Sequence, residues 1–509
     1  MPDDTQTLTE LLAGLEGCRL AGDDQVAVPG VAYHSRDVVP GGVFVALKGA
    51  ATDGHLFLDA ALSRGARVIV TEQELAPPPG VTLVRVPDAR LALAHLSAAF
   101  HRHPSRELVL VGITGTNGKT TTTYLLESIL EAAGHRTGVV GTVNYRVGSR
   151  TWPAPVTTPE SLDLQRLLRE MRSHDVSHVF LEVSSHALDL RRVDCAAFAA
   201  GVFTNLSQDH LDYHREMDDY FAAKSRLFLE LLANGCAPGG IAVLNLDDPR
   251  GEELHRRVSG PTLTYGVHPA SQVRPLKKRY RPHGLEARLT TPAGEIEISS
   301  RLVGPFNLSN ILAAAATALA LGLSPEEVSR GIAALQGVPG RLERFGPREG
   351  PAVLVDYAHT PAAVAQVLKA LEALDFSRVI TVIGCGGDRD RSKRPLMGQA
   401  AAAGSHLVVV TSDNPRTEDP LDIIREIEAG LKAMNVSRLT EAGARQGNAG
   451  YLVVPERREA IRLAVELARP GDAVLVAGKG HENYQIRGTE RFHFDDREEV
   501  REALKEYHG

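Results

Sequence analysis

The chain has 509 residues, of which 43% are hydrophobic and 23% are charged, and its formal net charge is −7. This composition is typical of a soluble globular protein, and the length predicts two to four domains because one core rarely serves more than about 300 residues. The negative charge, with no basic block to offset it, argues against a nucleic-acid-binding protein.

The cysteines and the N-terminus bear on the cellular compartment. The four cysteines are scattered and form no close metal-type pair, a pattern that favours reduced thiols in a cytosol: Cys18, Cys195, Cys236 and Cys385. The acidic N-terminus lacks an apolar signal core, and no apolar run is long enough to span a bilayer. We therefore expect a cytoplasmic protein without membrane insertion.

Residues 1–104 are predicted to form a small α/β domain. Residues 42–47 and 66–70 have the composition of strands, and residues 57–62 that of a helix closed by Gly65. A further helix is expected over 91–101. The segment His103–Ser105 is a plausible linker, since an apolar strand begins just after it.

The stretch from Val111 to Thr123 has the form of a phosphate-binding loop. It follows an apolar strand at 108–111 and precedes a segment of helical periodicity at 124–130. In such a loop backbone N–H groups and a helix N-terminus face the anion, the lysine reaches the outer phosphates, and the hydroxyl after it can ligate Mg²⁺. Ile113 occupies the place of the first glycine of the strict pattern. The sequence therefore predicts nucleoside triphosphate binding at Gly115, Thr116, Asn117, Gly118, Lys119, Thr120 and Thr121.

Two doubly wound, mostly parallel sheets are predicted after residue 104, one over 105–338 and a Rossmann-like one over 339–509. Residues 263–300 show short strand-like alternation and should add an accessory sheet, and 310–321 form an alanine-rich helix ended by Gly322. The expected strands are 108–111, 137–141, 178–183, 200–204 and 241–245 in the first sheet, and 353–355, 379–383, 407–410 and 473–476 in the second.

Polar residues follow many of these strands, at the edge where open α/β sheets bind ligands. Glu182 and His210 each come after an apolar strand, where a carboxylate and an imidazole can meet a magnesium–phosphate complex. Lys224 falls in an amphipathic helix, and its surroundings in the sequence alone favour a solvated lysine.

Over nearly its whole length the chain resembles the Mur ligases, the ATP-dependent amino-acid-adding enzymes of peptidoglycan precursor synthesis. The resemblance rests on ordered motifs at Gly115–Thr121, Glu182–Leu188, Thr204–His214, Val355–Pro361, Gly384–Arg391, Asp413–Pro420 and Ala477–Glu482. It implies that ATP converts a substrate carboxylate into an acyl phosphate, which the amine of an incoming amino acid attacks to form an amide. Such a reaction needs positioning and electrostatic stabilisation but no protein nucleophile.

The resemblance assigns roles to residues of the first two domains. Lys119 would screen the phosphates, Thr120 and Glu182 would ligate one Mg²⁺, and His210 the second, with Lys224 as a carbamylated lysine. Asn307, Arg341 and Asp356 would contact the nucleotide, with Arg341 at a hinge and effective only on closure. The muramyl substrate would meet Ser35, Thr157, Thr158, Ser184 and Arg192. The chain departs from the family at His34, usually aspartate, and at Leu190, often glutamine.

The third domain would bind the amine substrate, a diamino acid, through Arg389, Asp413, Asn414, Pro415, Arg416, Gly478 and Glu482. Arginine forks bind carboxylates bidentately, and the Asp-Asn-Pro-Arg form resembles enzymes that add meso-2,6-diaminopimelate, although L-lysine and L-ornithine remain alternatives. The implied partner is UDP-N-acetylmuramoyl-L-alanyl-D-glutamate, the implied cofactors are ATP and Mg²⁺, and we expect a monomer.

Two other classes of function are considered. A folylpolyglutamate-synthetase-type ligase shares the loop, but those enzymes begin close to it, and here about a hundred residues precede it. A P-loop ATPase acting as a regulatory switch would show triphosphatase activity without a muramyl substrate. It would leave the polar strand ends of the last domain unexplained.

Overall fold

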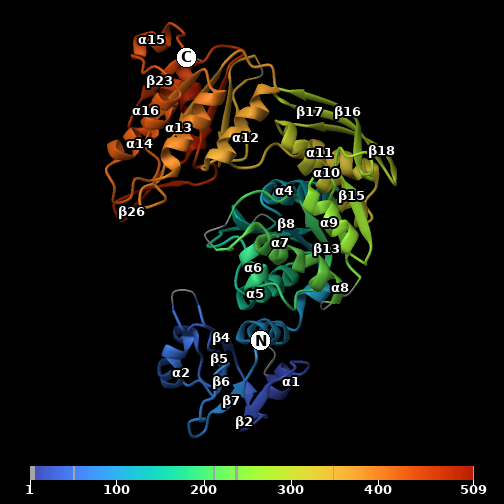
Figure 1. Cartoon of the computed structure of the whole chain (residues 1–509). Helices are drawn as coiled ribbons and strands as arrows, with labels where there is room; N and C mark the ends of the chain where they lie inside the picture. The colour runs from blue at the N-terminus through green and yellow to red at the C-terminus, as the bar shows by residue number, and fades with distance from the viewer. Residues whose placement is uncertain are drawn as a thin grey trace. The chain divides into compact units, whose positions relative to one another are not determined.

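The computed structural model describes residues 6–49, 52–148, 150–209, 213–234, 239–347 and 349–507 (Figure 1). The chain divides into two compact units. The first comprises Met1–Arg274, Thr291–Ala293 and Leu312–Val328, and the second Pro275–Thr290, Gly294–Ile311 and Ser329–Gly509. Within the described ranges, no helix combines the length and the apolar character that crossing a membrane requires.

The N-terminal part of the first unit is built on a five-stranded sheet. Its order is β2 (Arg19–Ala21), β7 (Thr82–Arg85), β6 (Val68–Thr71), β5 (Val43–Val45) and β4 (Val31–Ala32). The last four are parallel, and β2 is antiparallel to β7. The strands expected at 42–47 and 66–70 are confirmed, as are helices α2 (Leu58–Ser63) and α3 (Ala89–Phe100). Strand β7 was not predicted.

The segment His103–Ser105, which was expected to be a linker, packs against the rest of the unit. Pro104–Glu107 forms a 3₁₀ turn, preceded by His103 in the left-handed region at φ +50°. Pro104 and Ser105 are buried, and the Ser105 hydroxyl accepts a 3.0 Å hydrogen bond from the Ala197 backbone N–H. This turn fixes the start of the next strand.

An eight-stranded sheet forms the centre of the first unit. Its order is β11 (Arg150–Pro153), β10 (Asn144–Val147), β9 (Thr137–Val140), β12 (His178–Glu182), β8 (Val109–Thr114), β13 (Phe198–Phe203), β14 (Ile241–Asn245) and β15 (Thr262–Tyr265). From β9 to β15 all pairs are parallel, and β10 and β11 are antiparallel additions. The predicted strands of this sheet are confirmed. The carboxyl ends of β8, β12 and β13 therefore share one edge.

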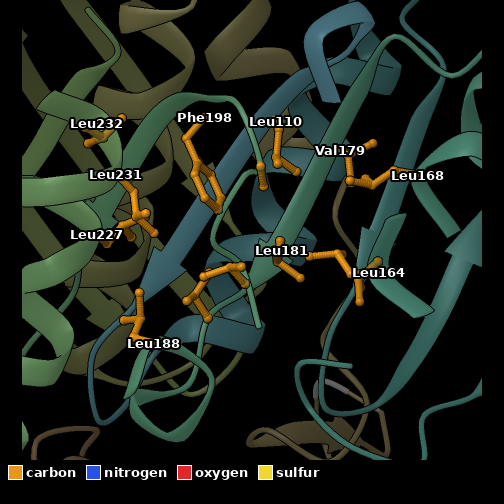
Figure 2. Packing of buried hydrophobic residues seen from close by; sticks show 14 of the residues in the cluster. Leu110, Leu164, Leu168, Val179, Leu181, Leu188, Phe198, Leu227, Leu231 and Leu232 are labelled. Carbon is orange, nitrogen blue, oxygen red and sulfur yellow. The ribbon is translucent and has the colours of Figure 1, made fainter. Parts of the chain in front are cut away.

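The core of this sheet is a dense apolar cluster (Figure 2). Leu110 on β8 and Phe198 on β13 lie in one cluster with Leu227 of the π-helical turn η4 (Leu227–Leu231). Gly112 is a glycine because a Cβ there would lie 2.8 Å from the Phe198 ring. The phenyl ring therefore occupies the space that a side chain at position 112 would need.

Further helices of the first unit flank this sheet. They are α4 (Lys119–Ala132), α5 (Ser161–Ser173), α6 (Ser185–Asp189), α7 (Met217–Arg226), α8 (Leu232–Asn234) and α9 (Pro249–Arg257). The accessory sheet expected at 263–300 is confirmed as β16 (Arg274–Arg281), β17 (Gly284–Thr291) and β18 (Gly294–Ser300), while β15 joins the central sheet instead. Helix α10 (Pro305–Ala320) begins five residues before the predicted start, and α11 (Pro325–Ala334) follows it.

The second unit contains a six-stranded sheet in the order β19 (Glu343–Phe345), β20 (Ala352–Asp356), β24 (Ala473–Ala477), β21 (Val379–Ile383), β22 (Leu407–Val410) and β23 (Gly450–Val453). All pairs but β19–β20 are parallel. The four predicted strands are confirmed, and β23 was not predicted. One apolar cluster joins the sheet to α12 (Pro361–Glu372), α13 (Lys393–Gly404) and α14 (Pro420–Ala433), and another to α16 (Arg457–Leu467) and α17 (Asp496–Tyr507), which gives a doubly wound unit (Figure 1).

The packing in Figure 2 predicts the effect of a large-to-small substitution. Phe198→Ala should destabilise the first unit by about 3–5 kcal/mol, because it removes a ring that is only 1% exposed and leaves a cavity. Chemical denaturation followed by circular dichroism measures the change. Phe57→Ala in the same unit, where the ring is 41% exposed, is the matched control. Equal losses in the two variants would contradict the prediction.

Candidate active site

The loop between β8 and α4 has the backbone shape that phosphate binding needs. Gly115 and Gly118 have φ values of +138° and +89°, a region that favours glycine. A Cβ on Gly115 would collide with the side chain of Thr204 and approach the backbone of Asn205 to 2.9 Å. The loop is therefore closely packed on the end of β13 and cannot accept a larger residue at Gly115.

Side chains from the end of β13 hold the loop in place. The Thr204 hydroxyl donates to the Asn117 carbonyl at 2.6 Å, and the Asn205 side chain accepts from the Asn117 N–H at 3.0 Å and donates to its carbonyl at 3.1 Å. The Ser207 backbone N–H donates to the Thr116 hydroxyl at 3.0 Å. The loop is thus preorganised before a ligand arrives. Thr120 and Thr121, in the first turn of α4, are both buried.

Two lysines converge on the loop. The Lys119 ammonium donates to the carbonyls of Gly115 and Thr116 at 2.9 and 2.8 Å, so it lies folded over the loop. The Lys224 ammonium reaches the same Gly115 carbonyl from α7, also at 2.9 Å, and lies 4.6 Å from the centre of the Tyr220 ring. A phosphate bound here would be held close to positive charge.

Lys224 is not a solvated helix lysine, because its side chain is only 1% exposed. Burial and the neighbouring Lys119 ammonium push the pKa of Lys224 well below its usual value, against a smaller opposing effect of Asp209. A lowered pKa increases the share of the neutral, nucleophilic amine. The expectation based on the residues around Lys224 in the sequence alone was wrong, since periodicity does not tell how deeply a long side chain is buried.

Glu182 ends β12 as a buried carboxylate on the same edge of the sheet. Thr142 holds both of its oxygens: the backbone N–H donates to Oε1 at 3.0 Å and the hydroxyl to Oε2 at 2.9 Å. Each carboxylate oxygen has more than one lone pair, so both can still accept a further ligand. Thr142 had no role in the sequence analysis. Only the return of β9 beside β12 brings it to Glu182.

The donor set at this edge fits a hard cation. A threonine hydroxyl and a carboxylate, Thr120 and Glu182, are oxygen ligands of the kind that Mg²⁺ takes together with phosphate oxygens and water. No cluster of three or more His, Cys, Asp or Glu side chains suited to a metal occurs among the described residues. A magnesium ion held chiefly by phosphates and water requires no such cluster. His210, the other expected ligand, lies outside the described residues.

Four of the five residues expected to bind the muramyl substrate form a connected group. The Thr158 hydroxyl donates to the Glu182 carbonyl at 2.7 Å and accepts from the Ser184 N–H at 3.1 Å. Arg192 donates to the Thr158 carbonyl at 3.1 Å, and the Thr157 hydroxyl lies 3.1 Å from the Thr142 hydroxyl. This group therefore adjoins Glu182.

The fifth residue, Ser35, opens the 3₁₀ turn Ser35–Asp37 beside the N-terminal sheet. Tyr33, two residues earlier, donates a 2.7 Å hydrogen bond to Asp163 on α5. At the first departure, the exposed His34 ring lies against the Tyr33 ring, with centroids 4.4 Å apart and a tilt of 42° between the ring planes. At the second departure, the Leu190 N–H closes α6 by donating to the His186 carbonyl at 2.8 Å.

In the second unit, Asp356 and Arg341 lie around the end of β20. The buried Asp356 carboxylate accepts the backbone N–H groups of Leu342 and Ala358 at 2.7 and 2.8 Å. Burial raises the pKa of Asp356, although Arg341 opposes the shift. The Arg341 guanidinium lies 5.0 Å from the centre of the Tyr357 ring. Asn307 is buried in the first turns of α10, where it donates to the Val303 carbonyl at 2.7 Å and accepts from Asn310 at 3.0 Å.

The loops after β21, β22 and β24 bring together most of the residues expected to bind the diamino acid. The Asn414 side chain donates to Glu482 at 3.3 Å, and Gly478, at φ +124°, has Asp413 Oδ2 3.4 Å from the position a Cβ would take. Burial and the Asp413 charge raise the pKa of Glu482. Asp413 keeps a lowered pKa despite its burial, because Lys479 and Arg457 stabilise its charge.

The two arginines of this region differ in their surroundings. Arg416 follows Pro415, has φ +52°, and donates to the Gly387 carbonyl at 2.7 Å. Arg389 is exposed and makes no ion pair with any part of the chain that the structure describes. A Cβ at Gly386 would lie 2.9 Å from Arg416 and 3.7 Å from Arg389, so both side chains flank one glycine loop. The strand-end loops of this unit thus carry both guanidinium groups, which suit carboxylates, and carboxylates, which suit an amine.

Models of one family match three parts of the chain. The Mur ligase family catalytic domain matches residues 27–101, the Mur ligase middle domain residues 113–318, and the Mur ligase glutamate ligase domain residues 340–480. Together the three matched ranges cover most of the sequence.

Similar proteins are found over the full length. A protein of Geobacter metallireducens is 50% identical over 505 residues, covering 98% of each chain, and one of Geobacillus thermodenitrificans is 44% identical over 503 residues, covering 98% of this chain and 99% of its own. Both are named UDP-N-acetylmuramoyl-L-alanyl-D-glutamate--2,6-diaminopimelate ligase.

Solved structures agree with this. A UDP-N-acetylmuramoyl-L-alanyl-D-glutamate--2,6-diaminopimelate ligase aligns over 99% of this chain and 100% of its own, with a TM-score of 0.73 and 33% identity. A folylpolyglutamate synthase of Mycobacterium tuberculosis covers only 77% of this chain, at TM-score 0.58 and 20% identity. The second likeness shows a shared fold alone.

The geometry of the phosphate loop predicts that Gly115→Ala abolishes triphosphate binding, because the added Cβ collides with the end of β13 and strains the backbone. Gly134→Ala is a matched control: its φ is +89°, but a Cβ there meets nothing within 4 Å. It should cost about 1–2 kcal/mol of stability and leave binding intact. Titration calorimetry with ATP and Mg²⁺ measures both. Unchanged affinity in Gly115→Ala would refute the prediction.

Proposed function

The chain belongs to the Mur ligase family of ATP-dependent amide-forming ligases, and we propose that it joins meso-2,6-diaminopimelate to UDP-N-acetylmuramoyl-L-alanyl-D-glutamate. The observation that carries this choice of substrates is the group of strand-end loops in the second unit, where Arg389, Arg416 and the Asn414 carbonyl lie around Gly386 and the Asn414 side chain donates to Glu482. The names of the full-length relatives support the same pair.

The diamino acid itself explains why such a pocket has both signs of charge. Its far end carries an ammonium and a carboxylate on one carbon, whereas lysine and ornithine lack that carboxylate. Asn414 and the carboxylates of Asp413 and Glu482 would hold the ammonium, and Gly478 and Pro415 would keep the loops close. The forks of Arg389 and Arg416 would bind the carboxylate bidentately. A substrate without it would leave arginines unpaired, at a cost of several kcal/mol by order of magnitude.

The first unit would supply the phosphorylated carboxylate. Gly115–Thr121 would bind the ATP phosphates. The Lys119 side chain would give up its two hydrogen bonds to backbone carbonyls and extend to the outer phosphates. Thr157, Thr158, Ser184, Arg192 and Ser35 would hold the muramyl substrate. Bringing a carboxylate to a phosphate unites two anions, so fixed positive charge lowers the barrier where charge accumulates.

Thr120 and Glu182 would hold one Mg²⁺, and His210 with carbamylated Lys224 a second. When bound, the ions neutralise charge on the transferred phosphoryl group. Asn307, Arg341 and Asp356 would contact the nucleotide. We further propose that the protein works as a monomer in the cytoplasm. The three described cysteines, Cys18, Cys195 and Cys385, are free thiols, which supports a reducing compartment.

The direct test supplies purified protein with ATP, Mg²⁺ and UDP-N-acetylmuramoyl-L-alanyl-D-glutamate, and one diamino acid at a time. Mass spectrometry of the product and release of phosphate report substrate and reaction together. We expect diaminopimelate to exceed lysine and ornithine in kcat/KM by at least about a hundredfold. Comparable rates with lysine would overturn the choice of amino acid. Phosphate release without the muramyl substrate would instead favour an ATPase switch.

Arg416→Lys should raise the KM for diaminopimelate by roughly a hundredfold, since an ammonium cannot reproduce the two parallel hydrogen bonds of a guanidinium. The KM for ATP should stay the same. Arg445→Lys is the control, because Arg445 also pairs with carboxylates in this unit, Glu441 and Glu466, but on the exposed surface. Initial rates at varied diaminopimelate measure the effect, and an unchanged KM in Arg416→Lys would count against a carboxylate contact.

Lys224→Ala should lower kcat by about a hundredfold or more, because the carboxylate-like carbamate that helps hold a metal ion is lost. Added acetate or chloride should partly restore the rate by supplying an anion in its place. Lys369→Ala, which removes an exposed helix lysine of α12, is the control and should behave as the wild type. Full activity of Lys224→Ala without additives would show that no modified lysine is needed.

A further inference from the structure

A second fully buried lysine, Lys479, lies directly behind the proposed amine pocket. Its side chain is 0% exposed, and its ammonium contacts three groups: the Asp413 carboxylate at 3.0 Å, the Asn414 side-chain carbonyl at 3.1 Å and the Tyr484 backbone carbonyl at 2.8 Å. Two of these three belong to the pocket. Lys479 itself stands behind them, so its influence on a ligand must act through its partners.

The contact with Asn414 determines which way that amide faces. An ammonium only donates, so the Asn414 atom beside it must be the oxygen, which also accepts the Ile486 backbone N–H at 2.9 Å. The amide nitrogen is then directed to the Glu482 carboxylate at 3.3 Å. The Asn414 amide therefore helps to orient the Glu482 carboxylate, which also interacts with the Tyr484 hydroxyl.

The contact with Asp413 fixes a charge and a position. The residue is nearly buried, and its backbone carbonyl is held by the Gln485 amide at 2.6 Å. Arg457, also fully buried, has Nη2 3.7 Å from the position that a Cβ on Gly478 would take, and it donates to Asp496 through two hydrogen bonds of 2.7 Å. Lys479 is thus the cation in direct contact with the Asp413 carboxylate.

We propose that Lys479 is a positioning residue for the far-end ammonium of the diamino acid. It acts through Asp413 and Asn414 rather than by touching the substrate. The inference rests on the proposed function, since it concerns the same pocket. A buried ammonium costs several kcal/mol of desolvation unless it is paired. Its neighbours compensate that cost here, and the arrangement fixes two recognition groups at once.

The alternative is that Lys479 has a purely structural role and only anchors the loop that carries Tyr484. The two hypotheses predict different effects of replacing Lys479 with an uncharged residue. Loss of an anchor weakens every property of the unit together, whereas loss of a positioning cation changes amine recognition and leaves the other substrates alone. A double-mutant cycle with Asp413 isolates the coupling between the two side chains.

The experiment compares wild type, Lys479→Met, Asp413→Asn and the double variant by initial rates at varied diaminopimelate, with ATP and the muramyl substrate saturating. Lys479→Met should raise the KM for diaminopimelate by about 30-fold and change kcat less than about threefold. The double variant should lose less than the sum of the two single losses, because without the Asp413 carboxylate Lys479 stabilises no charge there and its remaining effect is through Asn414. Lys479→Gln, which keeps a donor but not the charge, should fall between wild type and Lys479→Met and serves if the methionine variant does not fold.

A pH profile gives a readout that a purely structural role would not move. Charge on Asp413 favours ammonium binding, so removing Lys479 should shift the acid limb of kcat/KM for diaminopimelate to higher pH. The titratable and charged groups that face Asp413 from the surrounding elements are Lys479, Arg457, His359, Glu482, Tyr357 and Cys385. All of them except Lys479 remain in the variant, so the shift reports the loss of Lys479.

Arg378→Met is the matched control, because Arg378 forms an ion pair with the buried Asp472 beside the starts of β21 and β24, away from the strand ends that form the pocket. It should lower the melting temperature without changing the KM or the pH profile. The inference is overturned if Lys479→Met keeps the wild-type KM and pH profile, or if the losses of Lys479→Met and Asp413→Asn simply add. If the wild type itself does not use diaminopimelate, the proposed function fails instead.

Discussion

Parallel strand pairing is the constraint on which both candidate sites depend. In each unit the central strands run the same way, so every strand end, and the loop after it, comes to one edge. That edge collects Gly115, Glu182 and Asn205 in the first unit, and Asp356, Asp413 and Gly478 in the second. The site needs no additional long-range contacts of its own, because the strand pairing that forms the sheet already brings these residues together.

Many of the polar groups at these sheet edges are held in place by hydrogen bonds or ion pairs with neighbouring residues. Thr142 fixes Glu182, Thr204 and Asn205 fix the phosphate loop, and Lys479 fixes Asp413 and Asn414. A buried polar group left without a partner costs about 1–3 kcal/mol, so satisfied networks of this kind rigidify a site. Because the orientation is set before binding, a ligand does not have to supply the ordering free energy.

The sequence predicted the two sheets well because their inner strands are short apolar runs bounded by polar or glycine-rich turns. It missed β10, β11, β19 and β23 of these sheets, and in β23 the first residue is a glycine that weakens the strand signal. The identity of the loops also followed from sequence, since glycine and lysine spacing is local. What could not be predicted is the support behind them: Lys479 meets an asparagine 65 positions earlier in the chain.

The two buried lysines show how neighbours decide the chemistry of one residue type. Lys224 has a second ammonium nearby and a backbone carbonyl as its hydrogen-bond acceptor, so burial and repulsion both favour the neutral amine. Lys479 is equally buried, but its side-chain nitrogen touches a carboxylate and two carbonyl oxygens. A neutral amine can react with carbon dioxide, whereas an ammonium cannot, because it has no free lone pair. The two lysines do not differ in burial. They differ in their partners, which suit Lys224 to modification and Lys479 to holding a fixed positive charge.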